Sequence, residues 1–127
     1  MIDAGEALRA WHAAVNAGDA DAASRVATPD VRMGGPRGMA RGLDALRGSI
    51  ASAGIRLDPV ARHAVAPGVV VVEEDASWPG RAGAALHAAP VRVFSACLLR
   101  DGRVAAVLRH DGLPAALGEA RGLAGEG

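Results

Sequence analysis

Apolar residues near the start of the chain recur at the spacing of one helical face. These positions, three or four residues apart, are Ala4, Leu8, Trp11 and Val15. Asp3, with Glu6 three positions later, is typical of a capping box at a helix start, and Gly18 interrupts the series. The pattern predicts a first helix that ends before Gly18.

Two more helices are predicted in the first half of the chain. Asp19 can cap a short helix that ends near residue 27, before the helix-breaking Thr-Pro-Asp of residues 28–30. A brief strand at residues 31–33 precedes a Gly-Pro-rich stretch, residues 34–38, which we expect to be a loop or a bulged edge. Residues 43–53 then carry apolar positions on one helical face and stop at Gly54.

From residue 55 the period changes to that of β-strands. Four strands are predicted, at residues 55–65, 69–78, 89–100 and 103–111, with turns at 67–68, 79–85 and 101–102. A last short helix after Pro114 reaches about Ala120, and residues 122–127 form a flexible tail. This order predicts one α+β domain, residues 1–121, with the helices on one face of an antiparallel sheet.

Composition makes the predicted core one of small side chains. Half of the residues are apolar, but Ala and Val dominate, and Trp11, Trp78 and Phe94 are the only aromatic residues. Small side chains bury little area at each position, so we expect a second subunit to cover one sheet face. A homodimer is therefore predicted.

Charge and cysteine content exclude several classes of partner. Fourteen Arg residues, spread along the chain without a block, balance fourteen acids, so no nucleic acid is expected. Cys97 is the single cysteine, and with four scattered His it predicts neither a disulfide nor a metal site. Acids near the N-terminus and apolar runs no longer than Val69–Val72 predict a cytoplasmic protein without a membrane partner.

Residues 9–19 carry the most informative motif of the chain. The stretch Arg-Ala-Trp-His-Ala-Ala-Val-Asn-Ala-Gly-Asp resembles the first helix of SnoaL-like and ketosteroid isomerase families, within the nuclear transport factor 2-like superfamily. The order of elements, the Gly-Pro loop and the late Asp-Gly hairpin are similar as well. The resemblance implies a cone-shaped, curved antiparallel or mixed sheet, three N-terminal helices that roof a pocket, and no cofactor.

The catalytic acids of ketosteroid isomerases have no counterparts in this chain. The positions that resemble those of the family's catalytic groups hold Trp11, Ala96 and Gly35. An indole can donate only one N–H, and the other two residues have no side-chain acid. Steroid-type isomerisation is therefore not supported.

Strand alternation and the resemblance together select candidate pocket residues. On the second strand the more apolar set of alternate residues, which we place inward, is Val70, Val72, Glu74, Ala76 and Trp78. On the last two strands the resemblance implies that the inward residues are Arg92, Phe94, Ala96 and Leu98, followed by Val107, Arg109 and Asp111.

Two functions are compatible with these residues. The first is a binding domain for a small, mainly apolar molecule, with a pocket formed by Trp11, Trp78, Arg92, Phe94 and Val107. The alternative is a cofactor-independent enzyme, an isomerase, cyclase or epoxide hydrolase, with Asp111 as general acid or base, Arg109 beside it and Glu74 as a second carboxylate.

The charged residues of this set are also compatible with salt bridges at the rim of the cone, or with plain exposure to solvent. They are Glu74, Arg92, Arg109 and Asp111. Alternation places His110 opposite to Asp111, on an exposed or dimer-forming face, and His12 is expected on the helix surface.

Overall fold

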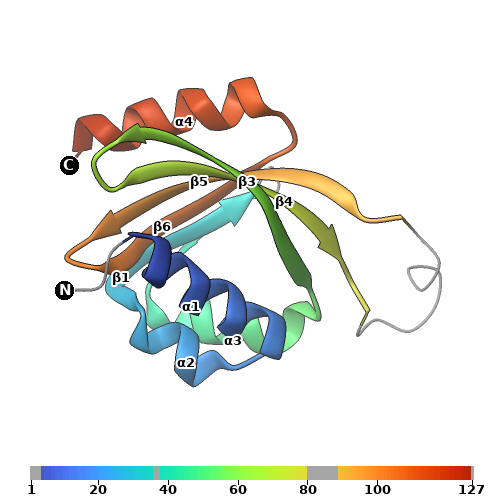
Figure 1. The fold of residues 1–127 in the computed structure, drawn as a ribbon. Coiled ribbons are helices and arrows are strands. Elements are labelled where there is room, and N and C mark those ends of the chain that lie inside the picture. The colour runs from blue at the N-terminus through green and yellow to red at the C-terminus, as the bar shows by residue number, and fades with distance from the viewer. Residues whose placement is uncertain (1–3, 36–37, 80–88, 127) are drawn as a thin grey trace.

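Six strands form one mixed, curved sheet, and helices pack on both of its faces (Figure 1). The computed structural model describes residues 4–35, 38–79 and 89–126. In chain order the elements are α1 (Ala4–Ala17), α2 (Ala20–Arg25), β1 (Ala27–Gly35), β2 (Gly38–Arg41), α3 (Leu43–Ala53), β3 (Arg56–Ala66), β4 (Val69–Ser77), β5 (Val91–Arg100), β6 (Arg103–His110) and α4 (Leu113–Glu126).

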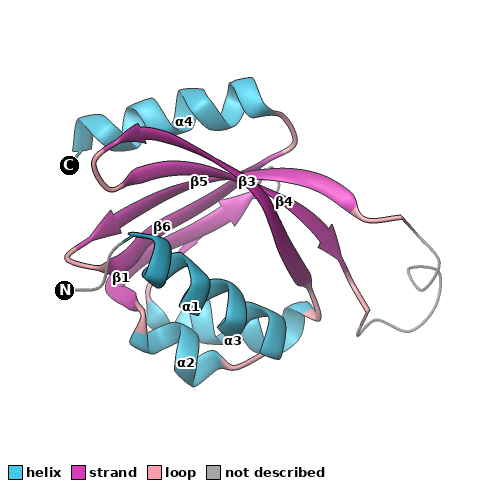
Figure 2. Cartoon of the chain, in the orientation of Figure 1, coloured by secondary structure: helices cyan, strands magenta, loops and turns pink. Residues whose placement is uncertain are grey.

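The strand order explains how the N-terminal helices reach one side of the sheet. Across the sheet the strands run β2, β1, β6, β5, β4, β3, with β1 parallel to β6 and every other pair antiparallel. Figure 2 shows α1, α2 and α3 together on one side of the strands and α4 alone on the other. The α+β class and the three roofing helices are thus confirmed.

Most predicted boundaries agree with the structure within two residues, and the exceptions involve long-range pairing. β1 is longer than the predicted strand because it pairs with both β6 and β2. β2, predicted as part of a loop region, forms a short edge strand. The predicted turn at residues 79–85 lies outside the described residues except for Pro79.

The C-terminal helix differs most from the prediction. α4 continues to Glu126 instead of ending near Ala120, so residues 122–126 are helical and Leu123 is 1% exposed. It packs against β3, β4, β5 and β6 on the face opposite to α1–α3, and the expectation that all helices share one face is wrong. Homodimerisation stays a prediction.

Each face of the sheet therefore has its own hydrophobic core. One core lies under α1–α3 and includes Val93, Cys97 and Val107, whereas the other lies under α4 and includes Ala96 and Leu98. Strands buried on both faces lose the polar and apolar alternation that normally distinguishes inside from outside.

For this reason the predicted orientation of β5 is wrong by one residue. Directly paired residues of antiparallel strands share a face, and Glu74 pairs with Val93 whereas Val70 pairs with Cys97. The α1–α3 side of β5 therefore carries the odd-numbered residues. The predicted inward set, Arg92, Phe94, Ala96 and Leu98, lies on the opposite face. The predicted orientation of β4 is confirmed, with Val70, Val72 and Ala76 in the core under the helices.

Within the described ranges, no helix has both the length and the apolar character needed to span a membrane.

Candidate functional site: a pocket under the helical roof

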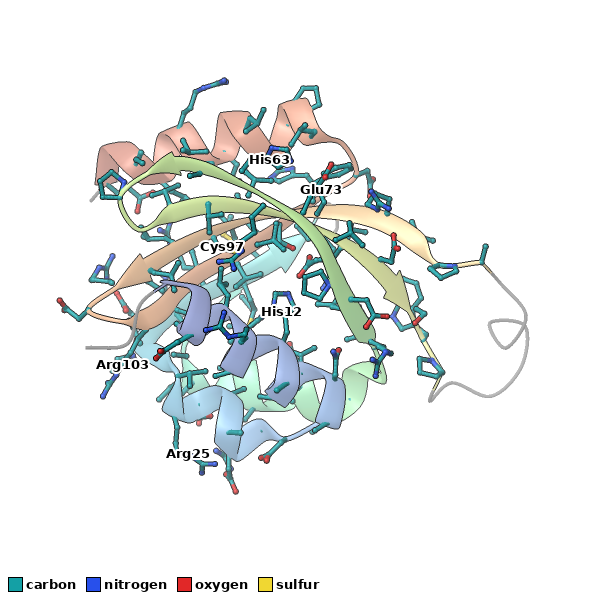
Figure 3. All side chains as sticks on the ribbon, in the orientation of Figure 1. His12, Arg25, His63, Glu73, Cys97 and Arg103 are labelled. Carbon is teal, nitrogen blue, oxygen red and sulfur yellow. The ribbon has the colours of Figure 1, made fainter. Side chains whose placement is uncertain are left out.

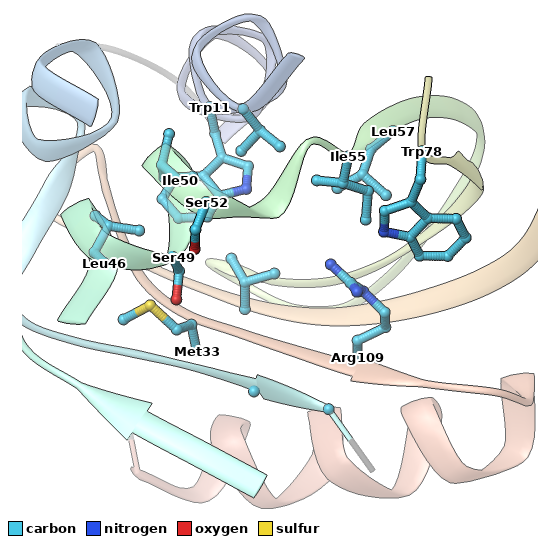
Figure 4. A pocket seen from close by; sticks show the side chains of 14 residues that line it. Trp11, Met33, Leu46, Ser49, Ile50, Ser52, Ile55, Leu57, Trp78 and Arg109 are labelled. Atoms are coloured by element: carbon cyan, nitrogen blue, oxygen red, sulfur yellow. The ribbon is translucent and has the colours of Figure 1, made fainter. Parts of the chain in front are cut away.

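A cavity of about 400 Å³ lies between the sheet and helices α1 and α3 (Figure 4). The residues that line it are mainly apolar and come from five elements and the adjoining loops. They are Trp11, Val15, Met33, Gly34, Gly35, Leu46, Ser49, Ile50, Ser52, Ile55, Leu57, Trp78, Val107 and Arg109. Its size is within the roughly 300–1,000 Å³ typical of small-molecule sites.

The two tryptophans of the chain both contribute to this pocket. Trp11 comes from the buried stripe of α1, and Trp78 directly follows β4. In Figure 4 Trp78 and Arg109 lie at one end of the pocket, whereas Met33, Leu46 and Ser49 lie at the other. Tryptophan fluorescence is therefore a direct probe of pocket occupancy.

Arg109 is the only charged residue among the described pocket residues. It lies near the end of β6, and its Nε atom is buried without a hydrogen-bond partner in the described parts of the chain. The other polar side chains are two hydroxyls and two indoles. Of the hydroxyls, Ser52 donates to the Gly48 carbonyl at 2.9 Å.

The structure places four of the predicted site residues in the pocket, namely Trp11, Trp78, Val107 and Arg109. Two predicted ligand-binding residues lie elsewhere. Phe94 packs against the core under α4, and Arg92 is exposed and bonded to Asp75, with Nε and Oδ1 2.8 Å apart. That hydrogen bond is the main cause of a raised Arg92 pKa. Phe94 and Arg92 were predicted to line the pocket because β5 was given the wrong orientation.

The three residues predicted to act in catalysis do not come together. Asp111 follows the end of β6, is exposed, and does not line the pocket. Glu74 faces the helices as predicted, but it is 1% exposed and is not among the residues that line the pocket. Only Arg109 reaches the cavity.

Glu74 instead forms a buried hydrogen-bonded cluster with His12 and Ser95. Its two carboxylate oxygens contact His12 Nε2 at 2.5 Å and Ser95 Oγ at 2.6 Å, and all three residues are buried. His12 Nδ1 lies 2.8 Å from the carbonyl oxygen of Leu8, one turn earlier in α1. Figure 3 shows His12 between its helix and the sheet. The cluster ties α1 to β4 and β5.

Hydrogen-bond chemistry limits the protonation of this cluster. A carbonyl oxygen can only accept, so Nδ1 of His12 carries a hydrogen that is donated to Leu8. The contact between Nε2 and Glu74 then holds one more proton, on either the nitrogen or the oxygen. The pair is imidazolium with carboxylate in one form and two neutral groups in the other. In both forms it brings no net charge into the core.

The prediction of His12 as a surface residue is wrong, and a sequence signal for its burial existed. His12 follows Leu8 by four positions, so it lies on the buried stripe of α1. A buried acid on an inward strand face also requires a partner. Glu74 and His12 could have been connected by that requirement, but only the tertiary structure identifies which polar residue of the roof meets the acid.

Cys97 and the other described histidines, His63 and His110, offer no reactive group to the pocket. Burial, reinforced by the negative charge of Glu74, raises the pKa of the Cys97 thiol far above its usual range, so the thiol stays neutral. His110 is half-buried, with Nε2 3.4 Å from Oε1 of Glu119 in α4. Over the described ranges, no three His, Cys, Asp or Glu residues are grouped as a metal site requires.

Proteins of known structure and a known domain family share this fold. The family model of the SnoaL-like domain matches residues 8–107. An NTF2-like protein of unknown function from Burkholderia pseudomallei is 18% identical, with a TM-score of 0.70 over 97% of this chain and 98% of that one. An NTF2-like protein of unknown function from Cytophaga hutchinsonii is 13% identical, with a TM-score of 0.71 over 86% of this chain and 89% of the other.

A putative polyketide cyclase from Sinorhizobium meliloti is similar as well. It is 20% identical, with a TM-score of 0.67 over 81% of this chain and 92% of that chain. At such identities the similarity shows the fold alone. No curated protein matches the sequence.

Proposed function

This chain belongs to the SnoaL-like domain family, and we propose that it binds a small, mainly apolar molecule in the pocket under α1 and α3. The observation that carries the proposal is the cavity of about 400 Å³, whose walls are largely aliphatic and aromatic. An apolar cavity with a few polar side chains is the usual composition of a small-molecule site.

Ligand binding explains features of the pocket that packing alone does not. A core of small side chains could close around a smaller space, yet here two indoles and Arg109 border an open volume. The indole nitrogens of Trp11 and Trp78 form no hydrogen bond with other described residues. Such groups gain partners when a ligand with polar atoms enters.

Acid–base catalysis through Asp111 is not supported by the arrangement of the pocket. A general acid or base must lie within hydrogen-bonding reach of the proton that it transfers. Asp111 is exposed outside the cavity, and the described lining contains neither a carboxylic acid nor a histidine. We therefore propose binding and assign no reaction to this pocket. The cytoplasmic location and the homodimer remain predictions.

The proposal is tested by blocking the pocket from α3 with Ser49→Phe. Ser49 lines the pocket with an exposed side chain, so a larger residue can occupy the cavity without displacing the core. The probe is 4-cyclohexylbutanamide, a neutral, non-fluorescent molecule, and binding is followed by tryptophan fluorescence and calorimetry. We expect its affinity to fall at least about fivefold, because the new ring takes up apolar surface that the probe would bury.

The matched control is Ala51→Phe. Ala51 is also exposed on α3 but does not line the pocket, so the control variant should bind the amide within about twofold of the wild type. Absence of any binding by the wild-type protein, or equal binding by the Ser49→Phe variant, would contradict the proposed function.

A further inference from the structure

We infer that the ligand of this pocket is an organic acid, whose carboxylate pairs with Arg109 while its apolar body extends toward Leu46 and Ile50. The inference rests on the proposed function and specifies the chemical class of the ligand. It follows from the charge and hydrogen-bonding state of the groups around the cavity.

Arg109 is a cation without a counter-charge among the described residues. An arginine stays protonated at every physiological pH, and a buried polar atom without a partner destabilises a protein. Its Nε atom is buried and unpaired within the described structure. The other arginines described here either have an acid within 4 Å or are exposed, the paired ones being Arg32, Arg47, Arg56, Arg92 and Arg100. Among the described arginines, Arg109 alone is half-buried and unpaired.

No acid within the described residues supplies the missing charge. Glu74 already bonds to His12 and Ser95, and Asp111 forms no ion pair with Arg109 although it is two residues away. Outside the described ranges, Asp3 is the only acidic side chain of the sequence. An anionic group from a bound molecule would supply both the charge and the acceptor that Arg109 lacks.

The remaining polar groups of the pocket also favour a ligand rich in acceptor atoms. The indole N–H groups of Trp11 and Trp78 can only donate, and neither is bonded to another described residue. Arg109 adds further donors, so the free side-chain donors of the pocket outnumber its acceptors, which are the hydroxyl oxygens of Ser49 and Ser52. A carboxylate presents only acceptor oxygens and is therefore complementary to this lining.

The layout of the pocket orients such a ligand. Arg109 and Trp78 lie at one end, and Met33 and Leu46 lie at the other, with Ile50 nearer the latter (Figure 4). The carboxylate would lie at the first end, where a guanidinium can form two parallel hydrogen bonds with it. The aliphatic or ring-containing part would then bury against the apolar residues of α3.

The test compares 4-cyclohexylbutanoate with 4-cyclohexylbutanamide, which has nearly the same size and shape but no charge. Affinities are measured by tryptophan fluorescence and calorimetry for the wild type, Arg109→Gln and Arg109→Lys. For the wild type we expect the acid to bind at least about tenfold more tightly than the amide, since charge-assisted bidentate pairs are roughly twice as strong as neutral hydrogen bonds.

The variants separate the charge of Arg109 from its packing. Arg109→Gln should remove the preference for the acid, because loss of the guanidinium lowers the affinity for the acid at least about tenfold and the affinity for the amide much less. Arg109→Lys should retain part of the preference. Arg103→Gln, an exposed position on the same strand, is the matched control and should keep the full preference.

The possible results distinguish the two proposals. If the wild type binds acid and amide equally, or if Arg109→Gln weakens both to the same degree, the organic-acid inference is overturned while the binding function stands. If the wild type binds neither probe, both proposals fail. The wild-type comparison decides the matter even if a substitution at Arg109 prevents folding.

Discussion

At the residue scale, the cluster of His12, Glu74 and Ser95 contains three of the four buried polar residues that the structure describes, the fourth being Thr28. Removing one member of a buried pair leaves the other without a partner, which costs far more than the intact pair contributes. The cluster also connects α1, β4 and β5, so it fixes how the roof of the pocket is placed over the sheet. Trp11, the residue before His12, lines that pocket.

Two substitutions of Glu74 should show how much of the free energy of unfolding depends on its hydrogen bonds to His12 and Ser95. Glu74→Ala should lower the free energy of unfolding by about 3–5 kcal/mol, because it leaves His12 and Ser95 unpaired in the core. Glu74→Gln should cost only about 1 kcal/mol, because its amide can donate to His12 Nε2 and accept from Ser95 Oγ. Urea denaturation monitored by circular dichroism measures both values.

The neighbouring Glu73 provides the control for that experiment. Glu73 is half-buried on the opposite face of β4, and its Oε2 lies 3.5 Å from Nε2 of His63. Figure 3 shows the two side chains on the side of the sheet that faces α4. Glu73→Ala should cost less than about 1 kcal/mol. Equal losses for Glu73→Ala and Glu74→Ala would argue against a special role for the buried cluster.

At the element scale, the close approach of β1 and β2 depends on a glycine. A Cβ atom on Gly34 would lie 2.7 Å from the carbonyl oxygen of Gly38 and 3.0 Å from Cα of Met39. A Cβ on the adjacent Gly35 would meet nothing nearer than Arg109, at 3.8 Å. Two consecutive glycines that look equivalent in the sequence thus have different structural requirements.

This contrast predicts different effects for two alanine substitutions. Gly34→Ala should destabilise the protein by about 1–3 kcal/mol, because backbone atoms of β2 must move to accept the methyl group. Gly35→Ala should change stability by no more than about 0.5 kcal/mol. Thermal denaturation of both variants measures the difference, and equal melting temperatures would contradict the close packing of β2 on β1.

At the scale of the whole molecule, α4 and the helical roof cover opposite faces of one sheet. The core under α4 includes Ala116, Ala120 and Leu123, all at most 1% exposed. The pocket lies on the other face, and none of its lining residues belongs to α4. Stability and ligand binding should therefore be partly separable by face.

Leu123→Ala tests that separation. The substitution should lower the free energy of unfolding by about 2–5 kcal/mol, as expected for a buried leucine replaced by alanine. The affinity for 4-cyclohexylbutanamide, measured where the variant is still folded, should stay within about twofold of the wild type. Arg121→Ala, exposed on the same helix, should alter neither quantity. A large loss of affinity in folded Leu123→Ala would show that the two faces are coupled.

The local pattern of the sequence was sufficient for the element order, the hairpin at Asp101-Gly102 and the inward face of β4. Helical spacing, turn residues and alternation are local properties, and β4 still alternates toward its end, where Glu73 and Asp75 are partly exposed while Glu74 and Ala76 are buried. Together with the family resemblance, this information placed Trp11, Trp78, Val107 and Arg109 at the pocket.

Only the tertiary structure decided the rest, because those features depend on contacts between distant segments. β5 is buried on both faces, so its sequence does not show which side faces the pocket, and Arg92 and Phe94 were misplaced for that reason. Residues 122–126 become the end of a packed helix because Leu123 finds a sheet face to cover. Likewise, Glu74 is sealed in the core because His12, 62 positions earlier in the chain, provides its partner.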